Sequence, residues 1–142
     1  MALKWYGEEV EKKVHDATRK AIDDITATCV LSAKRKVTLD TTLLQGSIEM
    51  RPAHMDVKGI VGLWGSFNNK YALFVELGTE PHWPPIDALR PWARRKLGDE
   101  NLAFPVARSI SIHGTKPQPF LRPTADEEYP KLTAKIRTYY GS

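Results

Sequence analysis

One apolar stripe near the N-terminus constrains the fold of this chain more than any other feature. Between Trp5 and Ser32, apolar residues recur at spacings of three and four, as they do on one face of an α-helix. The stripe consists of Val10, Val14, Ala17, Ala21, Ile25 and then Thr28 or Cys29. We therefore predict one long amphipathic helix. At about 25 residues it would be about 38 Å long, so the stripe is expected either to lie wholly in the core or to rest partly on a neighbouring subunit.

The pattern changes after this helix. The segment Val37–Ser47 has the composition of a loop with a short helical turn. Ile48–Arg51 and Val57–Trp64 alternate apolar and polar residues, and a proline-containing turn is expected between them at Pro52–Asp56. This arrangement predicts an antiparallel β-hairpin. Tyr71–Leu77 is either a short helix or a strand, because periodicity does not distinguish the two in so short a run.

Two further helices are predicted in the second half of the chain. The first is Ile86–Leu97, which closes at Gly98. The second spans about Asn101 to His113 and closes at Gly114. Because Pro105 is tolerated only in a first helical turn, the regular part of the second helix should begin close to Phe104.

The chain is expected to end in an extended strap followed by a helix. The segment Thr115–Pro123 is rich in proline and should cross the surface in an extended conformation. Thr124 could cap a last helix, Ala125–Tyr140, interrupted near Pro130. We therefore expect an α+β fold, a single domain over residues 1–142. In it, long N-terminal and C-terminal helices pack on a small antiparallel sheet and a helical hairpin is inserted.

Composition excludes several classes of protein. With 142 residues, 42% apolar and 27% charged, the chain resembles an average soluble domain with a sizeable core. No apolar run is long enough for a membrane span, and the N-terminus lacks the features of a signal or transit peptide, so we expect the protein to start in the cytoplasm. Cys29 is the single cysteine, so no intrachain disulfide can form, and the histidines have no zinc-site spacing.

The charge balance is mildly basic. The formal net charge is +4, and the positive residues gather at Lys34–Lys36 and at Arg90–Lys96. Both clusters lie near predicted helix ends, where cations complement the helix dipole. They are interpreted as solvated faces, with a patch for a polyanion or a protein partner as the alternative.

The tetrapeptide Glu76-Leu77-Gly78-Thr79 has the character of a turn. Gly78 permits a positive φ, so the chain can turn sharply after a buried segment. Glu76 would then be a partly buried carboxylate that needs hydrogen-bond donors. We hypothesise that the guanidinium of Arg122 pairs with it and pins the strap to the core, with backbone amides or solvent as the alternative partners.

Large apolar side chains that lie next to prolines can be interpreted in two ways. Phe120 and Leu121 lie between Pro119 and Pro123, and they either plug the core or contact a neighbouring subunit. Among the four aromatic residues Trp64, Phe67, Trp83 and Trp92, we expect Trp83, which precedes two prolines, to be the most exposed, and it is a third candidate for a subunit interface.

We expect no catalysis and no cofactor. His82, His113, Glu76 and Asp87 could form an acid–base pair or a metal site, but their spacing matches no known catalytic or metal motif. His54 and His82 are interpreted as ordinary exposed histidines in loops.

Two separated strings resemble the signature of a known family. The first is Tyr71-Ala72-Leu73-Phe74-Val75-Glu76-Leu77-Gly78-Thr79 and the second is Gln118-Pro119-Phe120-Leu121-Arg122-Pro123. Together they resemble the small tail-component proteins of lambda-like long-tailed phages, also described as head–tail joining, tail-completion or neck proteins. The pattern of that family reads Y-A-x-x-V-E-x-G-T and later P-F-L-R-P-A. This chain departs from it at Thr124, where alanine is commoner, and in Thr42–Ser47, which lacks the usual glycine before the leucine.

The resemblance implies a structural virion protein that is not an enzyme. Such a protein would form a homo-oligomeric ring of six subunits at the head–tail interface, although the isolated chain can be monomeric. The ring would complete the tail and join it to the head connector or stopper proteins and to the tail tube protein. DNA would pass through it without sequence-specific binding, and no membrane is involved. Assembly would take place in the host cytoplasm.

Two alternative functions remain open from the sequence. The first, in the same class, is a tail terminator that controls tail length. The second, in a different class, is a small DNA-binding regulator that uses the Arg90–Lys96 helix.

Overall fold

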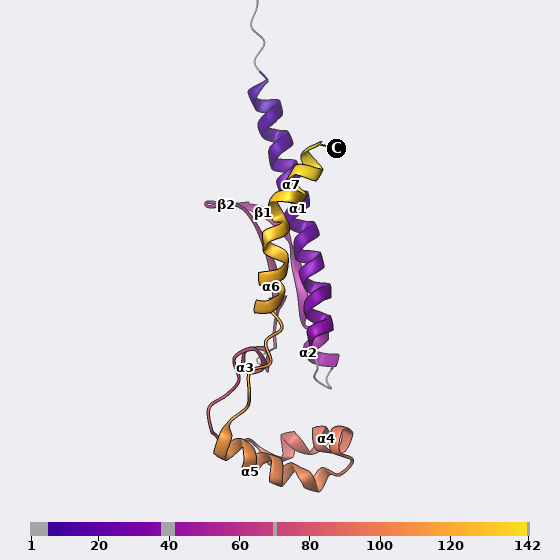
Figure 1. The fold of residues 1–142 in the computed structure, drawn as a ribbon, viewed down its shortest axis with the longest axis vertical. Helices are drawn as coiled ribbons and strands as arrows, with labels where there is room; N and C mark the ends of the chain where they lie inside the picture. The colour runs from indigo at the N-terminus through magenta and orange to yellow at the C-terminus, as the bar shows by residue number, and fades with distance from the viewer. Residues whose placement is uncertain (1–5, 38–41, 70, 142) are drawn as a thin grey trace, which may run out of the picture.

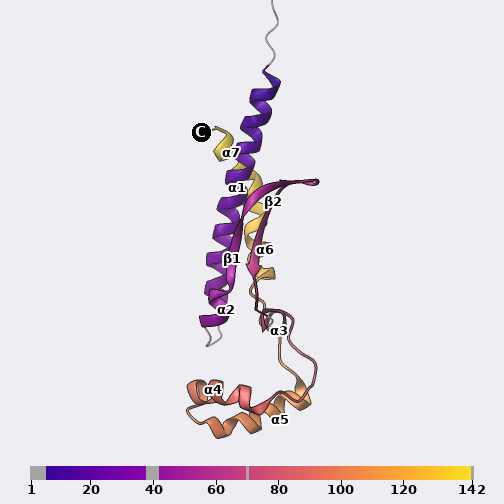
Figure 2. The ribbon, with the colours of Figure 1, turned by 180° about the vertical axis from the view of Figure 1, so that it is seen from behind.

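The structure, a computed structural model, describes residues 6–37, 42–69 and 71–141 and has an elongated shape (Figures 1 and 2). The elements in chain order are α1 (Gly7–Lys36), α2 (Thr42–Gly46), β1 (Ile48–Asp56), β2 (Gly59–Ser66), α3 (Tyr71–Leu77), α4 (Ile86–Leu97), the 3₁₀ turn η1 (Glu100–Leu102), α5 (Ala103–His113), α6 (Arg122–Glu128), the 3₁₀ turn η2 (Tyr129–Lys131) and α7 (Leu132–Gly141). The β-hairpin and the C-terminal helices pack along α1, and α4 and α5 lie together at the far end of the molecule (Figure 1). The predicted α+β fold class is confirmed.

Helix α1 is the spine of the molecule, and its apolar stripe is covered over only part of its length. Acidic Glu8 and Glu9 lie in its first turn and basic residues in its last, so both ends complement the helix dipole. The buried members of the stripe are Ala17, Ala21, Ile25 and Cys29, and Ala33 further along the helix is buried as well. Val10 and Val14 are 47% and 40% exposed, since the N-terminal turns project past the end of α7 (Figure 1). The C-terminal part of the stripe therefore packs in the core, whereas its first turns do not.

The β-hairpin is confirmed, but its turn lies further along than predicted. Strand β1 continues to Asp56, which pairs with Gly59, and the reversal falls at Val57 and Lys58. The turn expected at Pro52–Asp56 is wrong because the chain accommodates Pro52 inside the strand.

A β-bulge explains how β1 accommodates its proline. The register shifts between Arg51 and His54, so that β1 has one residue more than β2 at this point. Proline is tolerated at bulges, where a backbone hydrogen bond to the partner strand is already missing. The N–H of the adjacent Ala53 donates instead to Oδ1 of Asp23 on α1, at 2.7 Å. Helix α1 thus supplies the acceptor that β2 cannot.

Strand β2 approaches α1 closely at Gly62. A Cβ atom at this position would collide with Cγ2 of Ile22 and lie 3.1 Å from Cγ2 of Thr26. Only glycine fits between the strand and the helix without a shift of one or the other. This close contact allows the β-hairpin to pack directly against α1.

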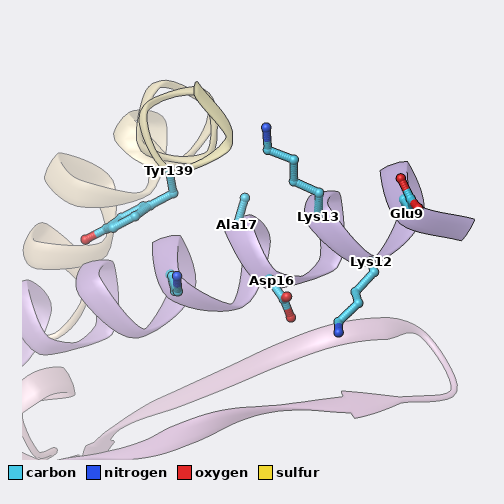
Figure 3. Close-up of a pocket in the computed structure, with 7 residues that line it drawn as sticks. Glu9, Lys12, Lys13, Asp16, Ala17 and Tyr139 are labelled. Carbon is cyan, nitrogen blue, oxygen red and sulfur yellow. The ribbon is translucent and has the colours of Figure 1, made fainter. Parts of the chain in front are cut away.

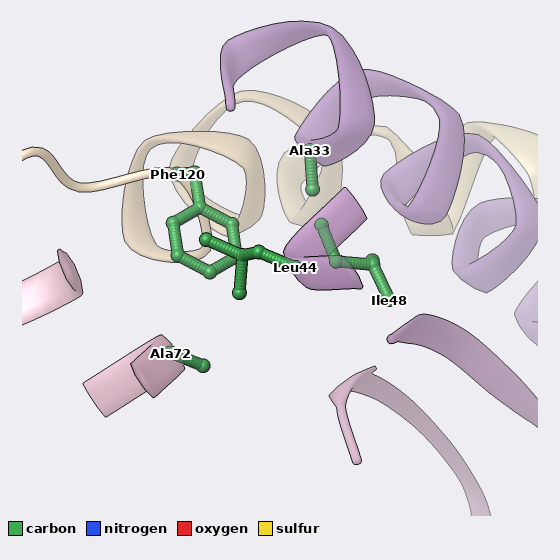
Figure 4. Close-up of a cluster of buried hydrophobic side chains, with 5 residues drawn as sticks. All are labelled: Ala33, Leu44, Ile48, Ala72 and Phe120. Atoms are coloured by element: carbon green, nitrogen blue, oxygen red, sulfur yellow. The ribbon is translucent and has the colours of Figure 1, made fainter. Parts of the chain in front are cut away.

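A small cluster of buried apolar side chains forms the centre of the core. It brings together Ala33 of α1, Leu44 of α2, Ile48 of β1, Ala72 of α3 and Phe120 of the strap (Figure 4). Phe120 is fully buried and is the largest side chain in this state among the residues that the structure describes. The interpretation that Phe120 plugs the core is confirmed.

Helices α4 and α5 form the predicted hairpin. Helix α4 ends at Leu97 and is capped by Gly98, which has a left-handed conformation with φ of 80°. The side chain of Asp99 then accepts a hydrogen bond from the N–H of Asn101, and α5 begins at Ala103 after η1. The residues Ala93, Ala103 and Ala107 are buried between the helices.

The C-terminal helix is interrupted near Pro130, as predicted, by the turn η2. The predicted cap is wrong, however. Helix α6 starts at Arg122, and Thr124 lies inside it, where its hydroxyl donates to the carbonyl of Phe120 at 2.7 Å.

Within the described ranges, no helix has both the length and the apolar character needed to cross a membrane.

Candidate functional site

The two motif strings, separated in sequence, lie side by side in the structure. We call this unit the clasp and define it as residues 75–79 together with residues 114–122. The N–H of Gln118 donates to the carbonyl of Val75 at 2.8 Å, which ties the strap to the last turn of α3. The clasp joins the body of the molecule to the α4–α5 hairpin (Figure 1).

Glu76 is the centre of the clasp. Its Oε2 accepts hydrogen bonds from the backbone N–H groups of Phe120 and Leu121, at 2.8 and 2.9 Å, and its Oε1 accepts one from the N–H of Arg122, at 2.9 Å. These groups lie at the N-terminus of α6, where backbone N–H groups have no acceptor within the helix. A carboxylate at this end is also favoured by the helix dipole. Glu76 therefore caps α6 from a different element.

This geometry corrects the hypothesis of a guanidinium–carboxylate pair. Glu76 does hold the strap, but its partners are backbone amides, which was the alternative interpretation. Arg122 contributes its N–H, and the residue is exposed.

The second half of the clasp is a short antiparallel bridge between Thr79 and Thr115. Each residue donates its N–H to the carbonyl of the other at 3.1 Å, and the two hydroxyl oxygens are 2.8 Å apart. Gly78 and Gly114 precede the two threonines and have φ of 72° and 69°. The backbones approach so closely that a Cβ on either glycine would collide with the opposite segment. The prediction of a sharp turn at Gly78 is confirmed.

Thr115 belongs to the clasp, yet the sequence interpretation did not single it out. Gly114 was interpreted only as a helix stop. The sequence nevertheless contains a signal for the role of Thr115, because Gly114-Thr115 repeats the dipeptide Gly78-Thr79 of the first motif. The structure pairs these two dipeptides with each other.

The remaining motif residues are Tyr71, Pro119, Leu121 and Pro123. Tyr71 begins α3, and Pro123 lies in the first turn of α6, where proline is tolerated. Leu121 is partly buried and packs against the core cluster, whereas Pro119 is exposed.

The three interface candidates have different surroundings. Trp83 is 53% exposed, as predicted, and its ring meets that of Phe104 edge to face, with centroids 5.9 Å apart. Phe120 has no exposed surface, so its side chain has none to offer a second subunit, and the interface interpretation fails for it. Leu121 packs against the core cluster and is partly buried, so only the exposed part of its side chain can contact a second subunit.

The candidate acid–base residues do not converge. Nδ1 of His82 lies 2.9 Å from the carbonyl of Glu80, and Nδ1 of His113 lies 3.3 Å from the carbonyl of Ser109, so each ring has a local partner. In the part of the chain that the structure describes, no group of three or more His, Cys, Asp or Glu residues could hold a metal ion.

An open depression of about 310 Å³ lies between α1 and α7 (Figure 3). It is lined by Ala17, Tyr139 and charged side chains of α1, among them Lys12, Lys13 and Asp16. Next to Tyr139, Lys13 lies over the ring of Tyr140 at 4.9 Å, which anchors the end of α7 on the spine.

The basic residues of α4 are partly neutralised within the hairpin. Nε of Arg90 lies 3.1 Å from Oδ1 of Asp87, and Arg94 pairs with Glu100. Two of the cations behind the DNA-binding alternative are therefore held in ion pairs.

A polar contact joins α1 to α7 around Asp24. Nζ of Lys135 and the hydroxyl of Tyr139 each lie 3.0 Å from Oδ2 of Asp24. The hydrogen bond from Lys135 lowers the pKa of Asp24 below its ordinary value of 3.8, and the bond to Asp24 raises the pKa of Tyr139. The charged carboxylate is thus the form that the folded protein prefers.

We expect this contact to make stability depend on pH. Because the pKa of Asp24 is lower in the folded state, its contribution is present above the unfolded-state pKa and is lost as pH falls through the folded one. The difference in Tm between wild type and Asp24→Asn should be largest at neutral pH and should shrink as the pH falls below 3.8, the ordinary pKa of the carboxyl. Circular dichroism melts from neutral to acidic pH measure it. Asp126→Asn, the same substitution at an exposed position, is the control for the change of side chain itself.

No family model, curated protein or solved structure matches this chain. The resemblance to phage neck proteins therefore depends on the motif residues alone.

Proposed function

We propose that this protein is a structural virion subunit of a tailed phage or prophage. A ring of six copies at the head–tail interface would complete the tail and join it to the head connector. The observation that carries the proposal is the clasp, in which the two family-like strings form one structural unit through Glu76 and the Thr79–Thr115 bridge.

The chemistry of the clasp supports an architectural role for the motifs. The carboxylate of Glu76 is engaged by three backbone N–H groups. The hydroxyls of Thr79 and Thr115 bond to each other. These side chains hold two distant segments of the chain together, which suits a motif that is required for shape.

The distribution of apolar surface supports assembly. Large apolar side chains are exposed on the first turns of α1, on α3 and on the α4–α5 hairpin, including Val10, Leu73, Phe74, Leu77, Trp83, Phe104 and Ile112. Extended exposure of this kind is typical of protein interaction surfaces. In a ring, one patch of each subunit must fit a different patch of the next, and an elongated subunit with separate patches suits that arrangement.

In this proposal the ring acts mechanically. Its subunits surround the DNA path, seal the connector to the tail tube and present a surface on which a filled head and a preassembled tail dock. DNA crosses the ring without sequence-specific contacts, and no cofactor takes part.

Electron microscopy of particles from a phage that carries a stop codon in this gene tests the proposal. Separate filled heads and complete tails, restored to whole virions by the gene in trans, are the expected result. Overlong tails would instead identify a tail terminator. Intact infectious particles that lack the protein would contradict a virion role altogether.

A further inference from the structure

The α4–α5 hairpin leaves its large apolar side chains uncovered. Phe104 and Ile112 of α5 are 53% and 57% exposed, and Trp83, just before α4, is 53% exposed, whereas the buried residues between the helices are alanines. Helices of 12 and 11 residues are marginally stable without a packed face. The hairpin also lies apart from the body (Figures 1 and 2). Its exposed face is therefore suited to contact with a second molecule.

That face combines apolar and positive character. Phe104, Arg108 and Ile112 are spaced four residues apart along α5 and so share one side of the helix. We call this set the α5 stripe; Trp83 extends it through its ring contact with Phe104. Residues 83–116 carry six basic and three acidic side chains, a formal net charge of +3.

The first turns of α1 have the complementary character. Val10 and Val14 are exposed and continue the stripe that is buried from Ala17 onward. Glu9 and Glu11, the sequence neighbours of Val10, flank it on either side because successive residues are about 100° apart around a helix. Residues 6–16 carry four acidic and two basic side chains, a formal net charge of −2 with histidine neutral.

We propose that the first turns of α1 in one copy of this chain pack on the α5 stripe of the next copy. Val10 and Val14 would cover Phe104 and Ile112. Arg108 would meet Glu9 or Glu11. The two surfaces lie at opposite ends of the molecule, so a single chain cannot bring them together (Figures 1 and 2).

The contact is heterologous, because it joins two different patches. Heterologous contacts form a closed ring when the rotation between subunits closes and an open filament when it does not. The inference deepens the proposed function, on which it rests, because it names the surfaces through which the ring would close.

A charge-reversal pair tests the contact with the full-length protein. In sedimentation velocity at up to about 1 mM protein, a concentration at which weak interfaces associate, wild type should form oligomers. Glu9→Arg/Glu11→Arg and Arg108→Glu should each weaken self-association about tenfold or more, since like charges then face each other. A mixture of the two variants should associate again. Monomeric wild type, or no recovery in the mixture, would overturn the contact.

Site-directed cross-linking locates the contact. Burial raises the pKa of the Cys29 thiol to about 11, so the native cysteine reacts slowly and new cysteines dominate the reaction. A bismaleimide should link Val10→Cys copies to Phe104→Cys copies. The control pair, Val10→Cys with Val57→Cys at the exposed tip of the β-hairpin, should give few links. Equal yields in both pairs would refute the proposed surfaces.

The two proposals can fail separately. Oligomers linked through α1 and α5, together with normal virions from the stop-codon phage, would keep the contact and remove the virion role. Separated heads and tails without such links would keep the virion role and remove this contact.

Discussion

Phe120→Ala should lower the free energy of unfolding by about 3–5 kcal/mol, the usual cost of truncating a buried phenylalanine. The ring is fully buried where α1, α2, β1, α3 and the strap meet, so its loss leaves a cavity that several elements would have to fill (Figure 4). Denaturant unfolding followed by tryptophan fluorescence measures the change. A decrease in Tm of roughly 10–15 °C should accompany it.

Phe74→Ala is the matched control for this effect. It removes the same side chain from a position that is 52% exposed, so the isolated protein should change by about 0.5 kcal/mol or less. If the two variants lost the same amount of stability, Phe120 would not be the centre of the core.

Glu76→Ala should cost about 2–4 kcal/mol, because three N–H groups at the start of α6 lose a charged acceptor at once. Glu76→Gln keeps one carbonyl oxygen and should lose about half as much, since neutral acceptors bind more weakly. Thermal unfolding of the full chain measures both changes.

Arg122→Leu separates the main-chain cap from a side-chain ion pair. Glu76 binds the N–H of residue 122, which leucine retains, so this variant should stay within about 0.5 kcal/mol of wild type. A loss as large as that of Glu76→Ala would restore the guanidinium–carboxylate pair and refute the cap.

Local patterns in the sequence were sufficient to predict most of the elements. The stripe from Val10 onward predicts α1 because helical periodicity is a property of the segment itself. Gly98 and Gly114 likewise predict where α4 and α5 end, because a glycine that stops a helix is also a local signal. These signals require no knowledge of what the segment packs against.

Long-range contacts decided the places where prediction failed. Pro52 predicted a turn, but Asp23 of α1 accepts the neighbouring N–H and allows β1 to continue past it. Thr124 had the sequence of a cap, yet Glu76 on α3 already fills that role. No local pattern records which distant side chain will reach a given backbone group.

The clasp was predictable in part. Its two strings were recognised, and the sequence identified Glu76 as a carboxylate in need of donors and Arg122 as its partner residue. The choice between the guanidinium and the backbone N–H of Arg122 depends on where α6 begins, which follows only from the folded chain.

The Thr79–Thr115 bridge also divides the chain into a trunk and an appendage. The polypeptide leaves the trunk at one of these residues and returns at the other, and the two are hydrogen-bonded neighbours. The intervening stretch can therefore be lengthened, shortened or exchanged while the path of the chain on either side stays the same. A fold organised in this way can vary the part that reaches outward and keep the remainder constant.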